Sequence, residues 1–98
     1  MYTTIRRYTL PNRNAVEEVA RRATEGFAPL LREAPGFVSW SLVYAGGDAL
    51  LAISTFEEQR AASASTRQAA AWVREHLADL LPDPPEVLVG EVLAHQAK

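Results

Sequence analysis

The chain has 98 residues, which is enough for one domain that buries about 60–70% of the surface its unfolded form would expose. Its net charge is −2 and its ten basic residues are scattered, which excludes the continuous basic surface of a nucleic-acid-binding protein. With no cysteine and two histidines, disulfides and cysteine chemistry are excluded and no metal site is expected.

The sequence predicts neither a secretory leader nor a membrane-spanning segment. No stretch approaches the roughly 20 apolar residues that span a bilayer, and the first residues lack an apolar signal region. We therefore expect a cytoplasmic protein that forms a single domain over residues 1–98. Nine of its ten basic residues are arginine and alanine is abundant, which suggests GC-rich coding and a bacterial source.

Residues 2–10 are predicted to form a first strand, because β-branched and aromatic side chains dominate there and Pro11 ends the run. Adjacent strand residues point to opposite faces, so either Arg6 or Arg7 is directed at whatever covers the sheet. Two readings stay open for that guanidinium. In the first it forms a salt bridge, for which Glu91 on the last strand is the expected partner, or lies at a strand end where its long side chain reaches water. In the second it belongs to an anion or carboxylate site.

The segment from Asn14 to Ala34 is predicted to form an amphipathic helix with Asn14 as its N-cap. Pro29 removes a backbone hydrogen bond inside this helix, and Gly26 weakens the same turn. We expect a kink or a break near residues 25–29.

Residues 37–56 are predicted to form a β-hairpin around Gly46 and Gly47, since glycine accepts the positive φ angles of a two-residue turn. That loop pairs Tyr44 with Ala49, Leu42 with Leu51 and Trp40 with Ile53. The large side chains then share one face of the hairpin. The middle of the other face carries small residues, which are Ser39, Ser41, Ala52 and Ser54.

Residues 57–81 are predicted to form a second helix that begins with a capping box at Thr55–Glu58. A break in this helix is expected near residues 66–68. Helical spacing places Trp72 and His76 together on its inward arc. Prolines at 82–85 stop this helix, and residues 86–95 alternate as a last strand.

The order β, α, β-hairpin, α, β predicts an α+β protein with a ferredoxin-like βαββαβ fold, a four-stranded antiparallel sheet and both helices on one face. The hairpin is apolar on both faces, so the uncovered side of the sheet needs a partner. A second copy of the chain is the simplest one, and we expect a homodimer.

Several motifs carry a resemblance over nearly the whole chain: Pro35-Gly36-Phe37 after the first helix, Phe56 closing the third strand, Ala70-Ala71-Trp72-Val73, and the ending Pro85–Glu91. In these the chain resembles the antibiotic biosynthesis monooxygenase-like (ABM) family of dimeric α/β barrels. The resemblance implies two ferredoxin-like protomers packed sheet against sheet, with a pocket between the sheet and helices of each. Members of the family include cofactor-free oxygenases, haem-degrading enzymes, stress-associated proteins and proteins of unknown activity.

The haem-degrading branch of that family uses an asparagine on the first strand, a tryptophan on the second helix and an iron-binding histidine about ten residues later. Here the first two positions fall at Arg6 and Ser65, and the third falls near Glu75 or His76. On this comparison neither haem nor any other cofactor is expected.

Two functions stay open. In the first, the protein is a small dimeric monooxygenase that needs no cofactor and acts on an apolar aromatic molecule, with His76 as the catalytic proton acceptor. Its pocket would be lined by Trp72, Ser39, Ser41, Ser54 and Arg6. In the second, the protein is a non-catalytic dimeric module that binds a small ligand or is stress-associated, and His76 and Trp72 are packing residues.

Overall fold

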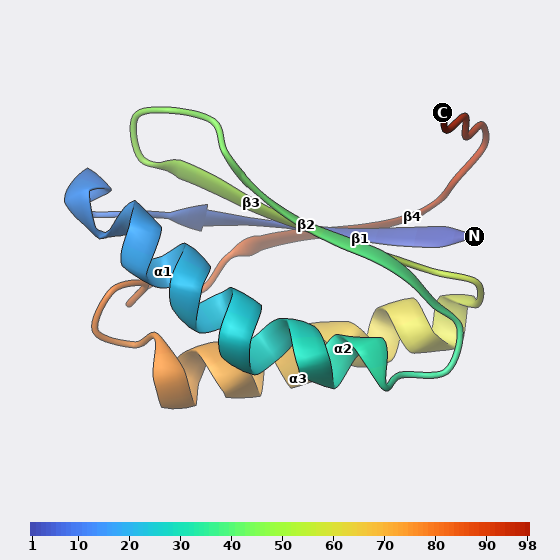
Figure 1. The fold of residues 1–98 in the computed structure, drawn as a ribbon, viewed down its shortest axis with the longest axis horizontal. Coiled ribbons are helices and arrows are strands. Elements are labelled where there is room, and N and C mark those ends of the chain that lie inside the picture. The colour runs from blue at the N-terminus through green and yellow to red at the C-terminus, as the bar shows by residue number, and fades with distance from the viewer.

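The computed structural model describes all 98 residues and has a sheet on one side and helices on the other (Figure 1). The strands are β1 (Tyr2–Thr9), β2 (Phe37–Tyr44), β3 (Ala49–Phe56) and β4 (Glu86–Glu91). They form one antiparallel sheet in the order β2-β3-β1-β4, so β1 and β3 are central. The predicted ferredoxin-like fold is confirmed. No helix is long and apolar enough to cross a membrane.

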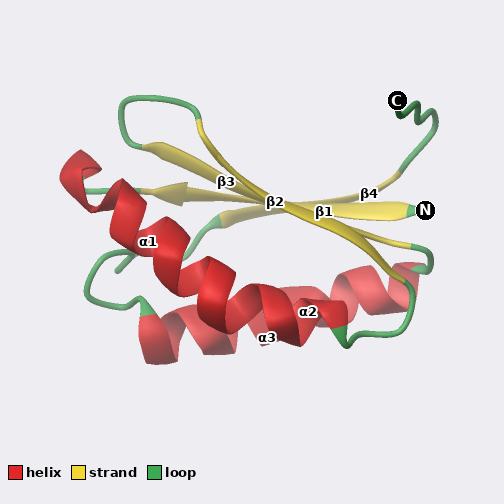
Figure 2. Ribbon diagram, viewed as in Figure 1, coloured by secondary structure: helices red, strands yellow, loops and turns green.

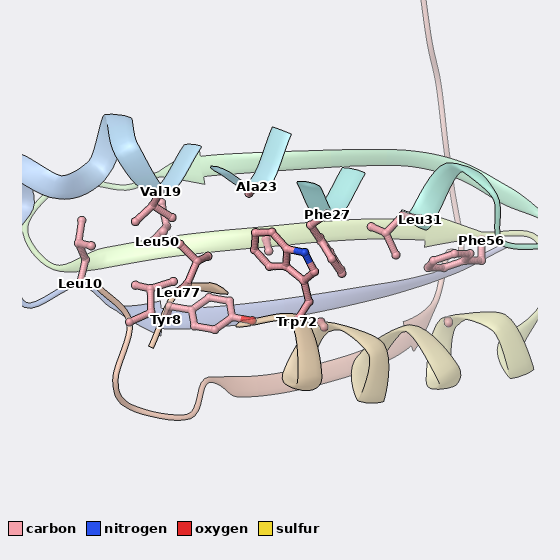
Figure 3. Close-up of a cluster of buried hydrophobic side chains, with 14 residues drawn as sticks. Tyr8, Leu10, Val19, Ala23, Phe27, Leu31, Leu50, Phe56, Trp72 and Leu77 are labelled. Atoms are coloured by element: carbon pink, nitrogen blue, oxygen red, sulfur yellow. The ribbon is translucent and has the colours of Figure 1, made fainter. Parts of the chain in front are cut away.

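The helical segments all pack on one face of the sheet, and the opposite face is uncovered (Figure 2). The first helical stretch comprises η1 (Arg13–Ala15), α1 (Val16–Arg22), η2 (Ala23–Phe27) and α2 (Ala28–Arg32). The second is α3 (Gln59–His76). Between the layers lies the core, in which Tyr8, Phe27, Leu31, Phe56 and Trp72 are labelled in Figure 3.

The irregularity expected in the first helix is present. Residues Ala23–Phe27 form a π-helical turn directly before Pro29. A π turn holds one residue more than an α turn, so it accommodates the proline without ending the helical stretch. The N-cap differs from the expectation, because the side chain of Asn12, and not that of Asn14, accepts a hydrogen bond at the start of the stretch.

The second helix also departs from its prediction at two points. It begins at Gln59 without a side-chain cap, because Thr55 belongs to β3 and its hydroxyl pairs with that of Thr3 at 2.9 Å. No break occurs near residues 66–68. The helix continues because the small, buried side chains of Ala62, Ser65 and Ala69 allow it to pack closely on the sheet.

The hairpin register predicted from Gly46 and Gly47 is wrong by one residue. The loop takes in Asp48 as well, and the structure pairs Leu42 with Ala52 and Trp40 with Ser54. A bulge between Phe37 and Ser39 absorbs the offset before Phe37 meets Phe56.

The shifted register changes which side chains of the two strands share a face. Because side chains alternate along a strand, a slip of one residue moves the side chains of one strand to the opposite face relative to those of the other. Trp40 and Leu42 therefore share the helix-covered face with Ala52 and Ser54, whereas Ser39 and Ser41 lie on the uncovered face.

Arg22 on α1 connects the two helical stretches, and its neighbour Arg21 forms ion pairs within the first stretch. Arg21 pairs with Glu18 at 2.7 Å and with Glu25 at 3.0 Å. Arg22 pairs with Glu18 at 2.8 Å and with Asp79 at 3.0 Å, and it also donates to the backbone carbonyl of His76. Hydrogen bonds from Arg21 and Arg22 lower the pKa of Glu18 to about 2.

The pKa of Glu18 predicts how acid affects stability. A carboxylate with a depressed folded-state pKa contributes stability in full above its unfolded pKa of about 4.3. That contribution is lost as the pH falls toward the folded value of about 2. We expect the thermal midpoint of the wild-type protein to fall more between pH 5 and pH 2 than that of Glu18→Gln, measured by circular dichroism. Glu17→Gln is the control, and equal slopes for Glu18→Gln and wild type would contradict the prediction.

Candidate active site

Arg6 lies in the middle of the central strand β1, between Ala52 of β3 and Val87 of β4. Its side chain is 1% exposed and points into the layer between sheet and helices. The expected salt bridge with Glu91 is absent because the register places Glu91 opposite Tyr2, whose hydroxyl is 3.4 Å from the carboxylate. Arg6 therefore has no acidic partner.

The contacts of the Arg6 guanidinium satisfy only part of its donors. Nη2 donates to the hydroxyl of Ser54 at 3.2 Å, and the ring centroid of Phe27 lies 5.7 Å from the guanidinium carbon. Nε and Nη1 are buried without a hydrogen-bond partner. Burial lowers the pKa of Arg6, and the neighbouring Tyr8 opposes that shift. An arginine keeps its charge at neutral pH even so, which leaves a buried cation with unpaired donors.

A second unpaired donor lies nearby. Trp40 on β2 pairs with Ser54 across the sheet, and its indole Nε1 is buried with no partner. Arg6 and Trp40 thus flank Ser54 on the helix-covered face. Buried N–H groups are nearly always paired in folded proteins, so unpaired ones gathered at one place need an explanation.

Both side chains line a cavity between the sheet and the helices that has a volume of about 30 Å³. Its walls are otherwise apolar and include Tyr8, Phe27, Trp72 and Val73. Figure 3 shows Tyr8, Phe27 and Trp72 directed into this layer from β1, η2 and α3. This volume holds an oxygen-sized group or two, not an aromatic ring.

A larger outer pocket adjoins this inner cavity. It measures about 260 Å³ and lies where the end of α3 and the segment Pro82–Pro85 meet the sheet. The two spaces share Tyr8, Val73 and Leu81 as walls, and Arg74 and Asp83 line the outer pocket. Burial raises the pKa of the Tyr8 phenol, and the charge of Arg6 opposes the rise. The outer pocket is the larger of the two and has room for a small ring.

The position of His76 differs from the expectation. Its side chain is 52% exposed and not inward, because α3 ends at this residue. The imidazole stacks on Trp72 with ring centroids 4.9 Å apart, and its Nε2 lies 3.8 Å from a Glu75 carboxylate oxygen. It lines an open depression with Arg21, Arg22 and Gly26, separate from the outer pocket. The catalytic role of His76 stays a prediction.

The other predicted pocket residues divide between the two faces of the sheet. The structure brings Arg6 and Trp72 to one cavity and places Ser54 in contact with Arg6. Ser39 and Ser41 are on the uncovered face, because the hairpin register is shifted. Tyr8 and Trp40 were missed as site residues. The alternation that placed Arg6 inward also indicates Tyr8, whereas Trp40 required the register.

No family model matches the sequence, and no curated protein is significantly similar to it. Solved structures do match. A monooxygenase from the gene ActVA-Orf6 of Streptomyces coelicolor, in complex with nanaomycin D, has 21% identity and a TM-score of 0.75 over 99% of this chain and 92% of its own. A Nitrosomonas europaea protein described as an antibiotic biosynthesis monooxygenase has 19% identity and a TM-score of 0.71, covering 96% and 100%.

The chain has the fold of the antibiotic biosynthesis monooxygenase-like proteins. This confirms the family resemblance at the level of the fold. The same fold is found in the haem-degrader MhuD of Mycobacterium tuberculosis, solved with two haems in its active site, with 21% identity and a TM-score of 0.74 over 99% of this chain and all of MhuD. The expectation that haem and other cofactors are absent is therefore wrong as an inference from this fold.

Trp72 lines both the inner cavity and the depression at His76. The absence of a side chain at Gly26 makes room for it, because a Cβ there would lie 2.8 Å from Cζ2 of Trp72. That distance is shorter than van der Waals contact allows. Gly26 lies within the π turn, so the irregular backbone and the indole fit together.

We expect Gly26→Ala to displace Trp72 and to lower the free energy of unfolding by about 1–3 kcal/mol, the usual effect of overpacking. Urea unfolding and the tryptophan emission of the folded state measure both effects. Gly90→Ala is the matched control, since nothing lies within 4 Å of a Cβ built there. Equal losses for the two variants would show that the contact with Trp72 is not limiting.

Proposed function

We propose that this protein is a monooxygenase-type enzyme that acts on a small aromatic molecule. The observation that carries the proposal is the pair of adjoining spaces between sheet and helices, with Tyr8, Trp40 and Trp72 lining the inner one and unpaired donors on Arg6 and Trp40. The outer pocket of about 260 Å³ has room for a ring, and it is close to the lower size of small-molecule sites. The likeness to the Streptomyces coelicolor monooxygenase in complex with nanaomycin D supports the same class of activity.

In this proposal Tyr8 is the residue that meets the substrate, because it lines both spaces and lies two positions from Arg6 on the same face of β1. Its hydroxyl is placed to donate a hydrogen bond to a substrate oxygen. His76 lies in the separate depression and so outside the inner cavity and the outer pocket.

Haem belongs in the test because a haem-degrader shares the fold. In this chain the exposed His76 imidazole is the residue that would hold the iron, in a depression where Arg21 and Arg22 are already paired with carboxylates. Bound haem supplies activation of dioxygen.

Turnover is measured as oxygen uptake with a panel of quinols and polyphenols, without and with added haemin. We expect uptake without haemin to fall about 10²-fold in kcat for Tyr8→Phe, the usual loss for one positioned donor. His76→Ala is expected to retain that uptake, because the imidazole of His76 lies outside the inner cavity and the outer pocket. Loss of uptake in His76→Ala but not in Tyr8→Phe would show that the imidazole, and not the phenol, takes part in the reaction. Binding of a panel compound with no uptake under either condition would favour the non-catalytic ligand-binding module instead.

We also propose that the protein is a homodimer in which two copies pack their uncovered sheet faces together. That face presents apolar side chains in mid-sheet, including Ile5, Ile53 and Leu88, and Leu88 is 62% exposed. A patch of this kind on a chain of 98 residues favours a partner with the same surface.

Sedimentation equilibrium at micromolar concentration is expected to give the mass of a dimer. Leu88→Asp should give a folded monomer, because the symmetry of the interface brings two carboxylates into an apolar surface. Leu30→Asp is the control, since Leu30 is exposed on the helical layer. A wild-type protein that sediments as a stably folded monomer would contradict the proposal.

A further inference from the structure

We propose that Arg6 and Trp40 form a binding site for an anionic oxygen carried by an aromatic ligand, such as a carboxylate or an enolate. This inference rests on the proposed function in using the same spaces, and it names the chemical class of the ligand. The unpaired atoms that carry it are Nε and Nη1 of Arg6 and Nε1 of Trp40.

The first argument is the cost of leaving Arg6 where it is. Transfer of a cation from water to a protein interior costs several kcal/mol unless the charge is paired. Arg6 is 1% exposed, and its polar neighbours are neutral: the hydroxyl of Ser54 accepts one hydrogen bond, the phenol of Tyr8 lies close by, and the ring of Phe27 contributes a cation–π contact. A methionine of similar length would fill the space without that cost. A ligand that supplies negative charge would explain why a guanidinium, and not an apolar side chain, is buried at this position.

The second argument is the chemistry of the cavity wall. The unpaired atoms of Arg6 and Trp40 are all N–H donors, and no carboxylate or imidazole lines the inner cavity, whose one hydroxyl is the phenol of Tyr8. Unpaired N–H donors select a group that accepts hydrogen bonds. An ionised oxygen is the strongest such group, because hydrogen bonds between a guanidinium and an anion are about twice as strong as neutral ones.

The third argument is size. The inner cavity of about 30 Å³ has room for an oxygen-bearing group, and the adjoining outer pocket of about 260 Å³, which shares Tyr8, Val73 and Leu81 with it, has room for a ring. A free inorganic anion would leave the outer pocket empty, and an uncharged ring would leave the donors unpaired. An aromatic anion matches both the donors and the sizes of the two spaces.

Binding is measured by isothermal titration calorimetry on the full chain, with two pairs of compounds matched in shape. One pair is 2-naphthoate and the neutral 2-naphthamide. The other is 2-hydroxy-1,4-naphthoquinone, an enolate at neutral pH, and its neutral 2-methoxy analogue. We expect the anion of at least one pair to bind about 10- to 100-fold more tightly than its neutral match, and the pair that shows this distinguishes a carboxylate from an enolate.

The decisive variant is Arg6→Met, with Arg7→Met as its matched control on the exposed face of the same strand. Arg6→Met should remove the preference for the anion and raise the thermal midpoint, since it replaces an unpaired buried charge with an apolar side chain. Arg7→Met should leave the preference for the anion unchanged. A structural role for Arg6 predicts the reverse for stability, so a lower midpoint in Arg6→Met with affinity retained would overturn the proposal.

Trp40→Phe keeps an aromatic ring and removes only the Nε1 donor, so it tests the site even where Arg6→Met fails to fold. We expect the anion to lose about 3- to 10-fold in affinity and the neutral match to lose none. Equal binding of both members of each pair by the wild-type protein would also overturn the inference. These binding measurements separate this inference from the proposed enzyme activity. Anion-selective binding without oxygen uptake supports the anion site and contradicts the enzyme activity. Oxygen uptake without anion selectivity supports the enzyme activity and contradicts the anion site.

Discussion

The burial of one guanidinium in the central strand constrains the rest of the structure. Arg6 needs a long, uncrowded space above the sheet, and the residues around it provide that space: Ser54 is small, Phe27 offers a ring face, and Trp72 closes the far side. The helical layer is held over this place by Arg22, which connects α1 to Asp79 and to the end of α3. The stability of the layer and the chemistry of the site are therefore set by different arginines, one paired with carboxylates and one without.

Much of the fold followed from the sequence because each element had a local signal. Proline and glycine marked the ends of the helices and the irregularity at Ala23–Phe27, and alternation directed one of two adjacent arginines into the core. The order of the elements then selected the ferredoxin-like sheet. A partner for Arg6 was not predictable, since the register of β4 against β1 places Val87 opposite it and Glu91 opposite Tyr2.

The site residues that sequence reasoning misplaced depended on offsets of one residue. A glycine pair is compatible with a two-residue loop and with the longer loop that includes Asp48, and only tertiary packing selects between them. That choice moved Ser39 and Ser41 out of the site and brought Trp40 in. His76 was assigned from helical spacing, which specifies a direction around the helix axis but does not indicate that the helix ends at that residue and leaves the imidazole exposed.

The π turn at Ala23–Phe27 also affects how this chain is compared with others. A π turn contains one residue more than the α turn it replaces, and the bulge between Phe37 and Ser39 adds another in β2. Aligned against a regular helix and a regular strand, the sequence is therefore displaced by one position after the first irregularity and by two after the second. Residues that are equivalent in space then fall in different columns unless gaps are allowed inside a helix and a strand. Superposition of backbones is unaffected by such gaps, and a shared fold can be evident in space while aligned sequences show little identity.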